Sequence, residues 1–372
     1  MRIGLYGRVL LKPGSGIVRY SYDLIENLLK YDKKDKFILY VQKNHLPYRE
    51  FDSTLEIHEV NLPYFMWRTS LFTRILDKDD LDIYHSSAYT LPLVSKKFRS
   101  FSTVSTFHGL HPEIFWQSFK DNIYCSLDYR SAAIFADRIQ AVSNTLKEEI
   151  HKIYKQPLDK IDVVYFGLSK EFQPISSKNA AKEKAIYERY GIRKGKYILC
   201  VSGTTKNKNT ETILKAWSIL KFKHKFKLPL VLLRADLNKK LTLIKSLGLL
   251  PGKDVIAIDW VDDMRYLYGL SNFTIYPSIY EGLGFPIIEA MACGAPVITS
   301  NASAMPEAAG NAALLVNNPT DPTEWSDAIL SLYSNPELKE ELVKKGFERA
   351  KEFSWDKIIK KVLNSYRKLS SM

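Results

Sequence analysis

The clearest fold signal in this sequence is the segment PSIYEGLGFPIIEAMACGAPVITS, residues 277–300. The run just before it, residues 273–276, is apolar and β-prone, and Pro277 ends it, so we expect a buried strand there. Pro286 suits the first turn of a helix, and Gly294 followed by Pro296 suits its end. The segment therefore predicts the order strand, loop, helix, strand.

The loop of this unit predicts a site for an anion. The N-terminus of a helix presents N–H groups without intrahelical partners and the positive end of the helix dipole, which together favour phosphate. Gly282 and Gly284 allow backbone to approach such a ligand closely. Glu281 lies in the loop and Glu289 about one turn into the helix. Because carboxylates accept hydrogen bonds, both suit hydroxyl groups of sugars beside a phosphate.

Glu281 and Glu289 resemble the E-x7-E signature of the GT4 family of retaining glycosyltransferases, which have the GT-B fold. The similarity continues through residues 296–298 (PVI), 305–307 (MPE) and 310–313 (GNAA). The resemblance implies an α/β protein with two Rossmann-like domains, whose parallel sheets face each other across a cleft. The alternative is a capping Glu and a buried helix Glu in another α/β enzyme, where each would need a partner.

A chain of 372 residues is long enough for two domains. Residues 168–182 are polar and broken by Pro174, so we place the boundary there. We predict a first domain over residues 1–170 that binds the acceptor and a second over 171–352 that binds the nucleotide sugar. The resemblance implies that an amphipathic helix in residues 353–372 crosses back to the first domain.

The net charge of +13 favours anionic partners. The basic residues are scattered and form no nucleic-acid-binding module, so we expect no nucleic acid partner. Three dispersed cysteines favour a reducing compartment and argue against a metal site. Residues 1–6 already read as a strand, so we expect no signal peptide, and no apolar run is long enough to span a membrane. We predict a cytoplasmic protein, with peripheral attachment to the inner face of the cell membrane as an alternative.

The N-terminal residues predict a βαβ unit, with strands at 3–6 and 37–41 and a helix at 17–30. Glycines in its first turn are typical of a phosphate-facing loop. However, Gly14 and Gly16 lack the third glycine of the dinucleotide fingerprint, so a mobile surface loop is equally compatible with these residues. The resemblance implies that Gly14 and Gly16 belong to a loop that folds over the donor diphosphate.

Residues 64–76 combine aromatic side chains with Arg68 and Arg74 at helical spacing. One interpretation is a helix that lies on a membrane or binds a lipid-linked acceptor. The other, which we favour, is a helix between strands that faces the core.

His108 stands at the end of a strand predicted for residues 102–108. Strand ends in open α/β sheets point at the ligand crevice, although a lone histidine is more often structural. Its position resembles the His of the GT4 His-Asp pair, which faces the transferred sugar. Gly109 replaces the Asp, which leaves the orientation of the imidazole open.

The strand predicted to end at Gly203, a candidate donor-binding residue, leads into a lysine-containing loop before a helix at 210–220. Lys206 and Lys208 could neutralise a phosphate held by the backbone, or they could form a solvated cluster. In the GT4 family this loop carries an Arg and a Lys to the donor diphosphate. Lys208 matches the Lys, whereas Asn207 falls at the Arg position, so Lys206 is our candidate for the second charge.

The turn after a strand at 255–258 predicts the site of the nucleotide base. By resemblance, Trp260 and Val261 are the candidates, although Trp260 could equally be a core residue. Asp262 and Asp263 could suggest a metal, but we favour the interpretation that one of them caps the next helix. We predict no metal site and no cofactor.

The combined prediction is a retaining, metal-independent glycosyltransferase that moves a hexosyl unit, with mannosyl as the candidate, to a glycan or lipid-linked acceptor. The donor would be GDP-mannose or a UDP-sugar. The resemblance implies that Glu289 binds the ribose and Glu281 the donor sugar. It also implies that the backbone N–H groups of Leu283, Gly284 and Phe285 hold the diphosphate together with the two lysines.

Glu281, His108 and Lys208 are the predicted catalytic residues. Two other classes of function remain open. One is a non-catalytic subunit that binds a sugar nucleotide or a partner enzyme, and the other is a phosphorylase or 2-epimerase of the same fold.

Overall fold

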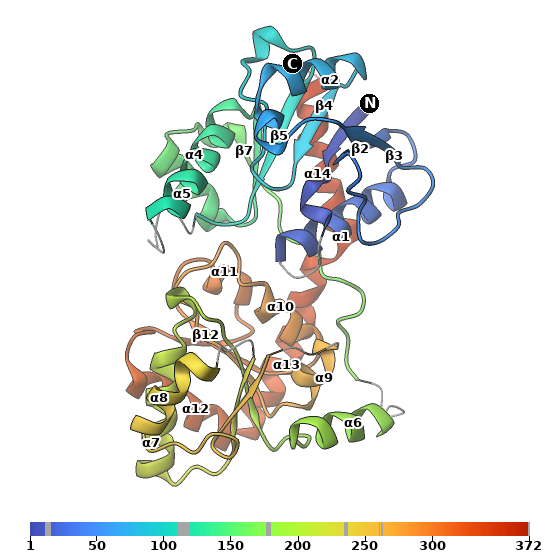
Figure 1. Ribbon diagram of the computed structural model, residues 1–372. Helices are drawn as coiled ribbons and strands as arrows, with labels where there is room; N and C mark the ends of the chain where they lie inside the picture. Colours follow the sequence, from blue (N-terminus) through green and yellow to red (C-terminus); the bar gives the residue numbers. More distant parts are fainter. Residues whose placement is uncertain are drawn as a thin grey trace. The chain divides into compact units, whose positions relative to one another are not determined.

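The computed structural model describes residues 1–11, 16–110, 119–175, 180–233, 237–259, 261 and 263–370. The chain divides into two compact units, Met1–Gly167 with Ser354–Met372 and Leu168–Phe353 (Figure 1). The chain thus passes between the units after Gly167 and after Phe353, where the sequence placed boundaries after residues 170 and 352. The last helix belongs to the first unit.

In its described residues, the first unit contains a seven-stranded parallel sheet of order β3-β2-β1-β4-β5-β6-β7. Its strands are β1 (Arg2–Tyr6), β2 (Lys36–Gln42), β3 (Glu56–Val60), β4 (Ile83–Ser86), β5 (Ser102–Phe107), β6 (Arg138–Ala141) and β7 (Ile161–Val163). Its α-helices are α1 (Gly16–Tyr31), α2 (Ser70–Lys78), α4 (Phe119–Phe135), α5 (Asn144–Tyr154) and α14 (Trp355–Ser370). Short 3-10 helices are η1 (Arg8–Leu11), η2 (Tyr64–Arg68), η3 (Lys96–Phe98) and η4 (Leu158–Lys160).

The described part of the second unit contains a six-stranded parallel sheet of order β10-β9-β8-β11-β12-β13. Its strands are β8 (Ile198–Val201), β9 (Leu230–Leu233), β10 (Val255–Ile258), β11 (Thr274–Tyr276), β12 (Val297–Ser300) and β13 (Leu314–Val316). Its α-helices are α6 (Ala180–Tyr190), α7 (Thr210–His224), α8 (Leu237–Ser246), α9 (Met264–Leu270), α10 (Phe285–Ala292), α11 (Met305–Ala309), α12 (Pro322–Ser334) and α13 (Pro336–Ala350). Short 3-10 helices are η5 (Lys206–Lys208) and η6 (Lys351–Phe353).

Two parallel sheets confirm the α/β class predicted from the sequence. Every strand that pairs with a neighbour does so in parallel, so each pair requires a crossover connection through another element. The inner strands β8 and β9 are buried at every residue, which explains why residues 198–201 and 230–233 are uniformly apolar rather than alternating. Consequently the loops at the carboxyl edge of each sheet are where polar, chemically active side chains gather.

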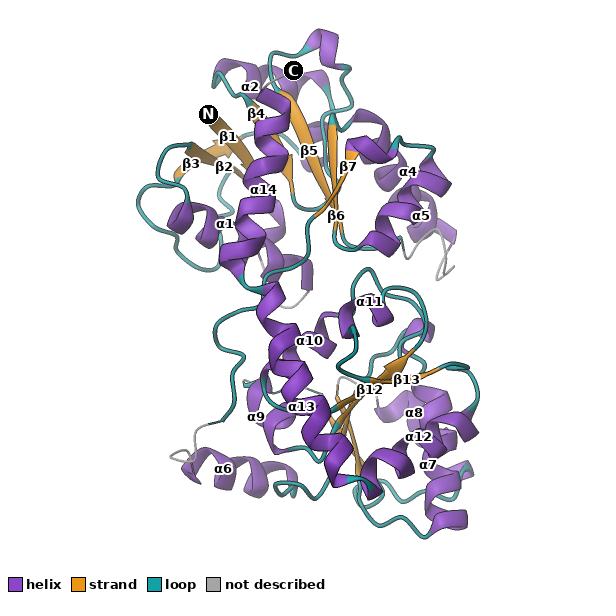
Figure 2. Cartoon of the chain, turned by 180° about the vertical axis from the view of Figure 1, so that it is seen from behind, coloured by secondary structure: helices purple, strands orange, loops and turns teal. Residues whose placement is uncertain are grey.

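Helix α14 completes the core of the first unit. Its buried side chains, among them Ile358, Val362 and Tyr366, pack with α1 and with one face of the sheet. Figure 2 shows α14 in front of the strands of the first sheet. The Tyr366 hydroxyl lies 2.6 Å from Nδ1 of the buried His85 in β4. The C-terminal residues are therefore an integral part of the first unit.

The segment 64–76 is not one helix, as its spacing had suggested. It forms η2 and α2, because Thr69 adopts an extended conformation and accepts a hydrogen bond from the Leu71 N–H as an N-cap. Trp67 and Phe72 are fully buried, whereas Phe65 and Leu71 are exposed. The segment thus covers the sheet with one set of side chains and faces solvent with another.

Among the described residues, no helix combines the length and the apolar character needed to cross a membrane.

Candidate functional site

The candidate site lies at the carboxyl edge of the second sheet, between β8 and β11. These strands are neighbours, and the chain continues from β8 outward to β9 but from β11 in the opposite direction to β12. Such a switch in strand order leaves a crevice at the carboxyl ends, where open α/β sheets bind ligands. The loop after β8 carries Lys208, and the loop after β11 carries Glu281. Both predicted catalytic residues of this unit therefore follow the two strands at the switch point.

The loop after β8 brings Lys208 back over the end of its own strand. A Cβ on Gly203 would lie 2.9 Å from Cγ of Lys208, so the glycine leaves room for the lysine side chain. Asn209, in the left-handed conformation at φ 52°, then turns the chain into α7. Lys206 stands on the same turn with an exposed side chain. The predicted second charge is thus present beside Lys208 but in contact with solvent.

The loop after β11 leads directly into α10, as predicted. Gly284 occupies its N-cap position at φ 89°, a conformation that L side chains rarely adopt, and Pro286 lies in the first turn. Gly282 and Leu283 are buried beneath this turn, while Phe285 is half-buried. Pro286 has no N–H, and the Ile287 N–H donates a 3.0 Å hydrogen bond to the Gly284 carbonyl, so the helix dipole is the feature that adds positive potential here. This start of α10 is suited to an anion.

Lys208 and Glu281 form an ion pair of 2.6 Å between Nζ and Oε1. Nζ also lies 3.0 Å from the hydroxyl of Tyr276, the last residue of β11. Burial by itself lowers the pKa of Lys208, but Tyr276 and Glu281 outweigh it, so the pKa lies above its ordinary value. Burial, followed by the charge of Glu281, raises the pKa of Tyr276. At neutral pH the lysine is therefore charged and the tyrosine neutral.

Glu289 lies in the middle of α10 and is 7% exposed. The hydroxyl of Tyr268, in α9, donates a hydrogen bond of 2.9 Å to its Oε2. Burial, followed by the charge of Glu289, raises the pKa of Tyr268, and the same two causes raise the pKa of Cys293 to about 12. The second carboxylate is thus held by a partner that lies in the helix after the predicted base-binding turn.

That turn is described only in part. Val261 is buried, whereas Trp260 and Asp262 lie outside the described residues. The Asp263 side chain accepts a hydrogen bond from the Arg265 N–H and caps α9, which is the interpretation we favoured for one of the two aspartates. Across the described ranges, no three His, Cys, Asp or Glu side chains converge as a metal site would require.

His108 follows β5 in the first unit, and a backbone carbonyl orients it. Its Nε2 lies 2.6 Å from the Ser87 carbonyl, which can only accept, so Nε2 carries the proton and Nδ1 is the basic nitrogen. The Tyr89 hydroxyl accepts a 2.8 Å hydrogen bond from the His108 N–H. Burial lowers the pKa of His108 to about 4, against the opposing effect of Ser87. The Ser87 carbonyl thus orients the neutral imidazole although Gly109 replaces the Asp of the family pattern.

Gly16 is exposed and begins α1, while Gly14 lies outside the described residues. The structure brings Lys208 and Glu281 into contact, and it places Glu289 in the helix that follows the same loop. Sequence reasoning missed Asn207, Tyr276 and Tyr268 as partners of these groups. An aromatic residue ending a strand beside a lysine loop was a weak signal for Tyr276, whereas the contacts of Tyr268 carried no sequence signal.

Two family models match nearly consecutive parts of the chain. "Glycosyltransferase Family 4" matches residues 14–172, and "Glycosyl transferases group 1" matches residues 182–349. The interval between the two matches, residues 173–181, follows shortly after the passage from the first unit to the second at Gly167.

Curated relatives include O-antigen chain mannosyltransferase B of Escherichia coli, 28% identical over 307 residues, which are 77% of this chain and 74% of that protein. The O-antigen chain mannosyltransferase RfbU of Salmonella typhimurium (strain LT2) is 26% identical over 347 residues, 88% of this chain and 89% of that protein.

Among solved structures, a glycosyltransferase from Rickettsia africae ESF-5 superimposes with a TM-score of 0.76 at 22% identity, over 99% of this chain and 98% of that one. Anabaena Alr3699/HepE in complex with UDP-glucose gives a TM-score of 0.73 at 17% identity, with full coverage of both chains. At these identities the structural similarity establishes a common fold.

Proposed function

We propose that this chain, which belongs to the GT4-type glycosyltransferases of the GT-B fold, transfers a mannosyl unit from a nucleotide-diphosphate sugar to a glycan or lipid-linked acceptor. The observation that carries the proposal is the ion pair of Lys208 with Glu281 beside the start of α10. A cation and a helix N-terminus suit the diphosphate, and a carboxylate suits the hydroxyls of the sugar. Mannose is favoured because two related proteins are named O-antigen mannosyltransferases.

In the proposed reaction the bond between the sugar C1 and the phosphate oxygen breaks, and a bond from C1 to the acceptor oxygen forms on the same face. The electron pair of the broken bond stays on the diphosphate, which also takes the acceptor proton. Negative charge therefore grows on the leaving group, where fixed positive groups have their largest effect on rate. Lys208 and the start of α10 would supply that charge, and anomeric configuration is retained without an enzyme nucleophile.

For His108 the family pattern implies contact with the transferred sugar, and we assign it that role. Its Nε2–H is occupied by Ser87, and its basic Nδ1 is buried without a hydrogen-bond partner among the described residues. Glu289 would bind the ribose and Val261 the base by backbone and apolar contact. Each assignment follows from the family pattern at these positions and from the position of each residue in its unit.

GDP-mannose is expected to be the donor that stabilises the protein most in a thermal-shift panel with UDP-glucose, UDP-GlcNAc, GDP and UDP. A ligand at 100 times its Kd raises the free energy of unfolding by about 2.7 kcal/mol. Incubation with GDP-mannose and a lipid-linked acceptor should then release GDP and give a product whose mass increases by one hexose. EDTA should leave the rate unchanged. Failure of every sugar nucleotide in the panel both to stabilise the protein and to be cleaved would reject the proposal.

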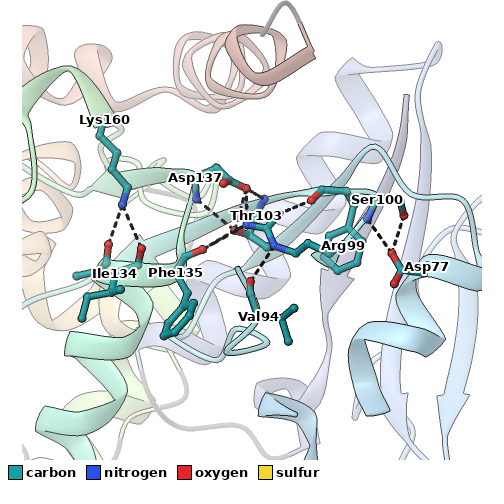
Figure 3. A network of polar contacts seen from close by, with 11 residues as sticks. Asp77, Val94, Arg99, Ser100, Thr103, Ile134, Phe135, Asp137 and Lys160 are labelled. Carbon is teal, nitrogen blue, oxygen red and sulfur yellow. Dashed lines mark hydrogen bonds and ion pairs between the residues drawn. The ribbon is translucent and has the colours of Figure 1, made fainter. Parts of the chain in front are cut away.

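We further propose that a surface along α2 contacts anionic membrane lipids. The segment after β4 is held beside α2 at both ends, by a 2.8 Å bond from the Leu93 N–H to the Arg68 carbonyl and a 2.9 Å bond from the Ser100 N–H to Asp77. Figure 3 shows Asp77 contacting Ser100, with Arg99 and Val94 nearby. The two segments therefore present their exposed side chains together.

This surface, here called the α2 surface, is both apolar and basic. Its exposed residues are Leu71, Arg74, Lys78, Leu93, Lys96, Lys97 and Phe98. Phe98 is 68% exposed, although burying a large aromatic side chain is ordinarily favourable. Apolar side chains among basic ones match the interface of an anionic bilayer, where each basic residue contributes about 1 kcal/mol.

Replacing Lys96 and Lys97 by Glu is expected to weaken binding to phosphatidylglycerol vesicles by at least about 30-fold, because two attractive charges are lost. Co-sedimentation with vesicles measures this change. The double variant Lys223→Glu with Lys227→Glu, in the second unit, is a charge-matched control. It should lose no more than half of the vesicle-binding free energy that the Lys96 and Lys97 variant loses. Equal weakening in both double variants would mean that net charge, not the α2 surface, determines binding.

A further inference from the structure

Asn207 connects the two loops of the candidate site from a buried position. It lies in the middle of η5, between Lys206 and Lys208, and is 2% exposed. Its carbonyl accepts a 2.8 Å hydrogen bond from the Ile279 N–H. Its side-chain Nδ2 donates to the Tyr280 carbonyl at 3.1 Å and lies 3.3 Å from Oε1 of Glu281. One residue after β8 therefore binds three successive residues after β11.

We propose that Asn207 is a positioning residue that sets the orientation of the Glu281 carboxylate, and not a ligand of the donor diphosphate. The inference rests on the proposed function, since it assigns a role within the same site. The amide donates toward the interior of the site, to protein oxygens, so its donor capacity is used before a ligand arrives. In the GT4 pattern this position carries an arginine of the diphosphate site. In this chain the asparagine at the same position binds the neighbouring loop instead.

The contacts explain how orientation is achieved. Lys208 Nζ and Asn207 Nδ2 both donate to Oε1 of Glu281, at 2.6 Å and 3.3 Å. Two donors from fixed directions restrict rotation of the carboxyl group, and within the described residues these contacts leave Oε2 available for a sugar hydroxyl. The ammonium of Lys208 has three N–H donors, of which Glu281 and Tyr276 take two. The third remains for a phosphate oxygen.

The loop itself depends on the same residue. The Tyr280 carbonyl and the Ile279 N–H lie in the irregular segment between β11 and α10, where no ladder or helix satisfies backbone groups. Asn207 satisfies both of them. Removing the side chain therefore releases the carboxylate and one end of the loop together, whereas the backbone bond to Ile279 persists.

A double-mutant cycle tests the proposal with Asn207→Ala, Glu281→Gln and the combination. Asn207→Ala is expected to lower kcat by at least about tenfold and to change the donor KM by less than about threefold, because the site loses orientation rather than a phosphate ligand. In the Glu281→Gln background the same change should have less than about a threefold effect, since residues that act through one another are not additive. Asn207→Asp keeps the volume but removes the donor, and should match or exceed the effect of Asn207→Ala.

Hydrogen exchange supplies a readout that does not require activity. Amides in residues 277–284 should exchange at least about tenfold faster in Asn207→Ala than in wild type, because the loop loses a buried hydrogen bond. Thr205→Ala is the control in the same turn, since the Thr205 side chain is exposed and makes no capping bond. It should leave this exchange unchanged.

The outcomes are distinguishable. A wild-type protein that transfers no sugar rejects the proposed function, and hydrogen exchange still tests the contact. An increase in donor KM of more than about tenfold with unchanged kcat would instead make Asn207 a ligand of the donor. Unchanged exchange in residues 277–284, or full additivity with Glu281→Gln, would overturn the positioning role.

Discussion

Glu281→Gln is expected to lower kcat for sugar transfer by about 10²- to 10³-fold with the fold intact, the range observed when one preorganised electrostatic group is removed from an active site. The neutral amide is nearly the same size as the carboxylate but removes the negative charge opposite Lys208. The lysine then lacks its anionic partner, although the Tyr276 hydroxyl still lies 3.0 Å away, and the sugar hydroxyl loses a charged acceptor.

Initial rates against donor concentration measure this effect. Glu211→Gln is a matched control, because Glu211 is an exposed carboxylate at the start of α7 in the same unit, paired with Lys240 at 2.7 Å. Its kcat should stay within about twofold of wild type, as is usual for surface substitutions. Thermal unfolding of both variants checks the fold. A Glu281→Gln enzyme with the wild-type rate would remove Glu281 from the mechanism.

Acid is expected to destabilise the first unit much more than the second. Burial and the charge of His108 lower the pKa of His85 to about 3, and burial lowers the pKa of His108 to about 4. An unfolded histidine has a pKa of about 6.5, so below that pH the unfolded state binds more protons than the folded state. At pH 5 the two folded histidines are still neutral. Each then costs about 2 kcal/mol, or about 4 kcal/mol for the pair.

Hydrogen exchange followed by mass spectrometry at pH 7 and pH 5, corrected for intrinsic rates, reports this difference locally. Peptides that cover β4 and β5 should lose protection at pH 5 relative to peptides that cover β8 and β11. In the sequence of the second unit, residues 168–353, His224 is the one histidine, and it is exposed. His85→Gln should reduce the pH dependence by about half, whatever its own effect on stability at pH 7. An equal loss of protection in both units would show that the two histidines do not cause it.

The sequence predicted the unit around residues 273–300 well, for a local physical reason. Pro277, Gly284 and Pro286 restrict backbone dihedrals where they stand, and the structure confirms a strand, a loop and a helix there. The cap of α5 has the same local character, since the Ser143 side chain accepts from the Leu146 N–H three residues on. Local chemistry of this kind needs no knowledge of the rest of the fold.

Long-range contacts were not predictable in the same way. The pairing of Lys208 with Glu281 joins residues 73 positions apart and depends on β8 lying beside β11. The orientation of His108 depends on the carbonyl of Ser87, and a carbonyl carries no side-chain signature. Strand β3 escaped detection because its sequence, EIHEV, is charged, which suits an edge strand whose burial is low.

The two departures from the GT4 pattern have physical explanations within their own units. At position 207, where the family has an arginine, the Asn207 amide donates to the Tyr280 carbonyl and to the Glu281 carboxylate. The loop that carries Glu281 is therefore held without the arginine. At position 109 the missing carboxylate is replaced, for orientation of the imidazole, by the Ser87 carbonyl, while the Tyr89 hydroxyl accepts from the backbone N–H of His108. Both favour a catalytic protein over a subunit that only binds.

A crystal structure of the protein with bound GDP-mannose, or with GDP, examines the nucleotide-sugar site most directly. The account predicts phosphate oxygens within about 3.2 Å of Lys208 Nζ and of backbone N–H groups in residues 283–285, with the ribose against Glu289 and the mannose against Glu281. A nucleotide bound elsewhere, with Lys208, Glu281 and Glu289 all out of contact with it, would contradict the account.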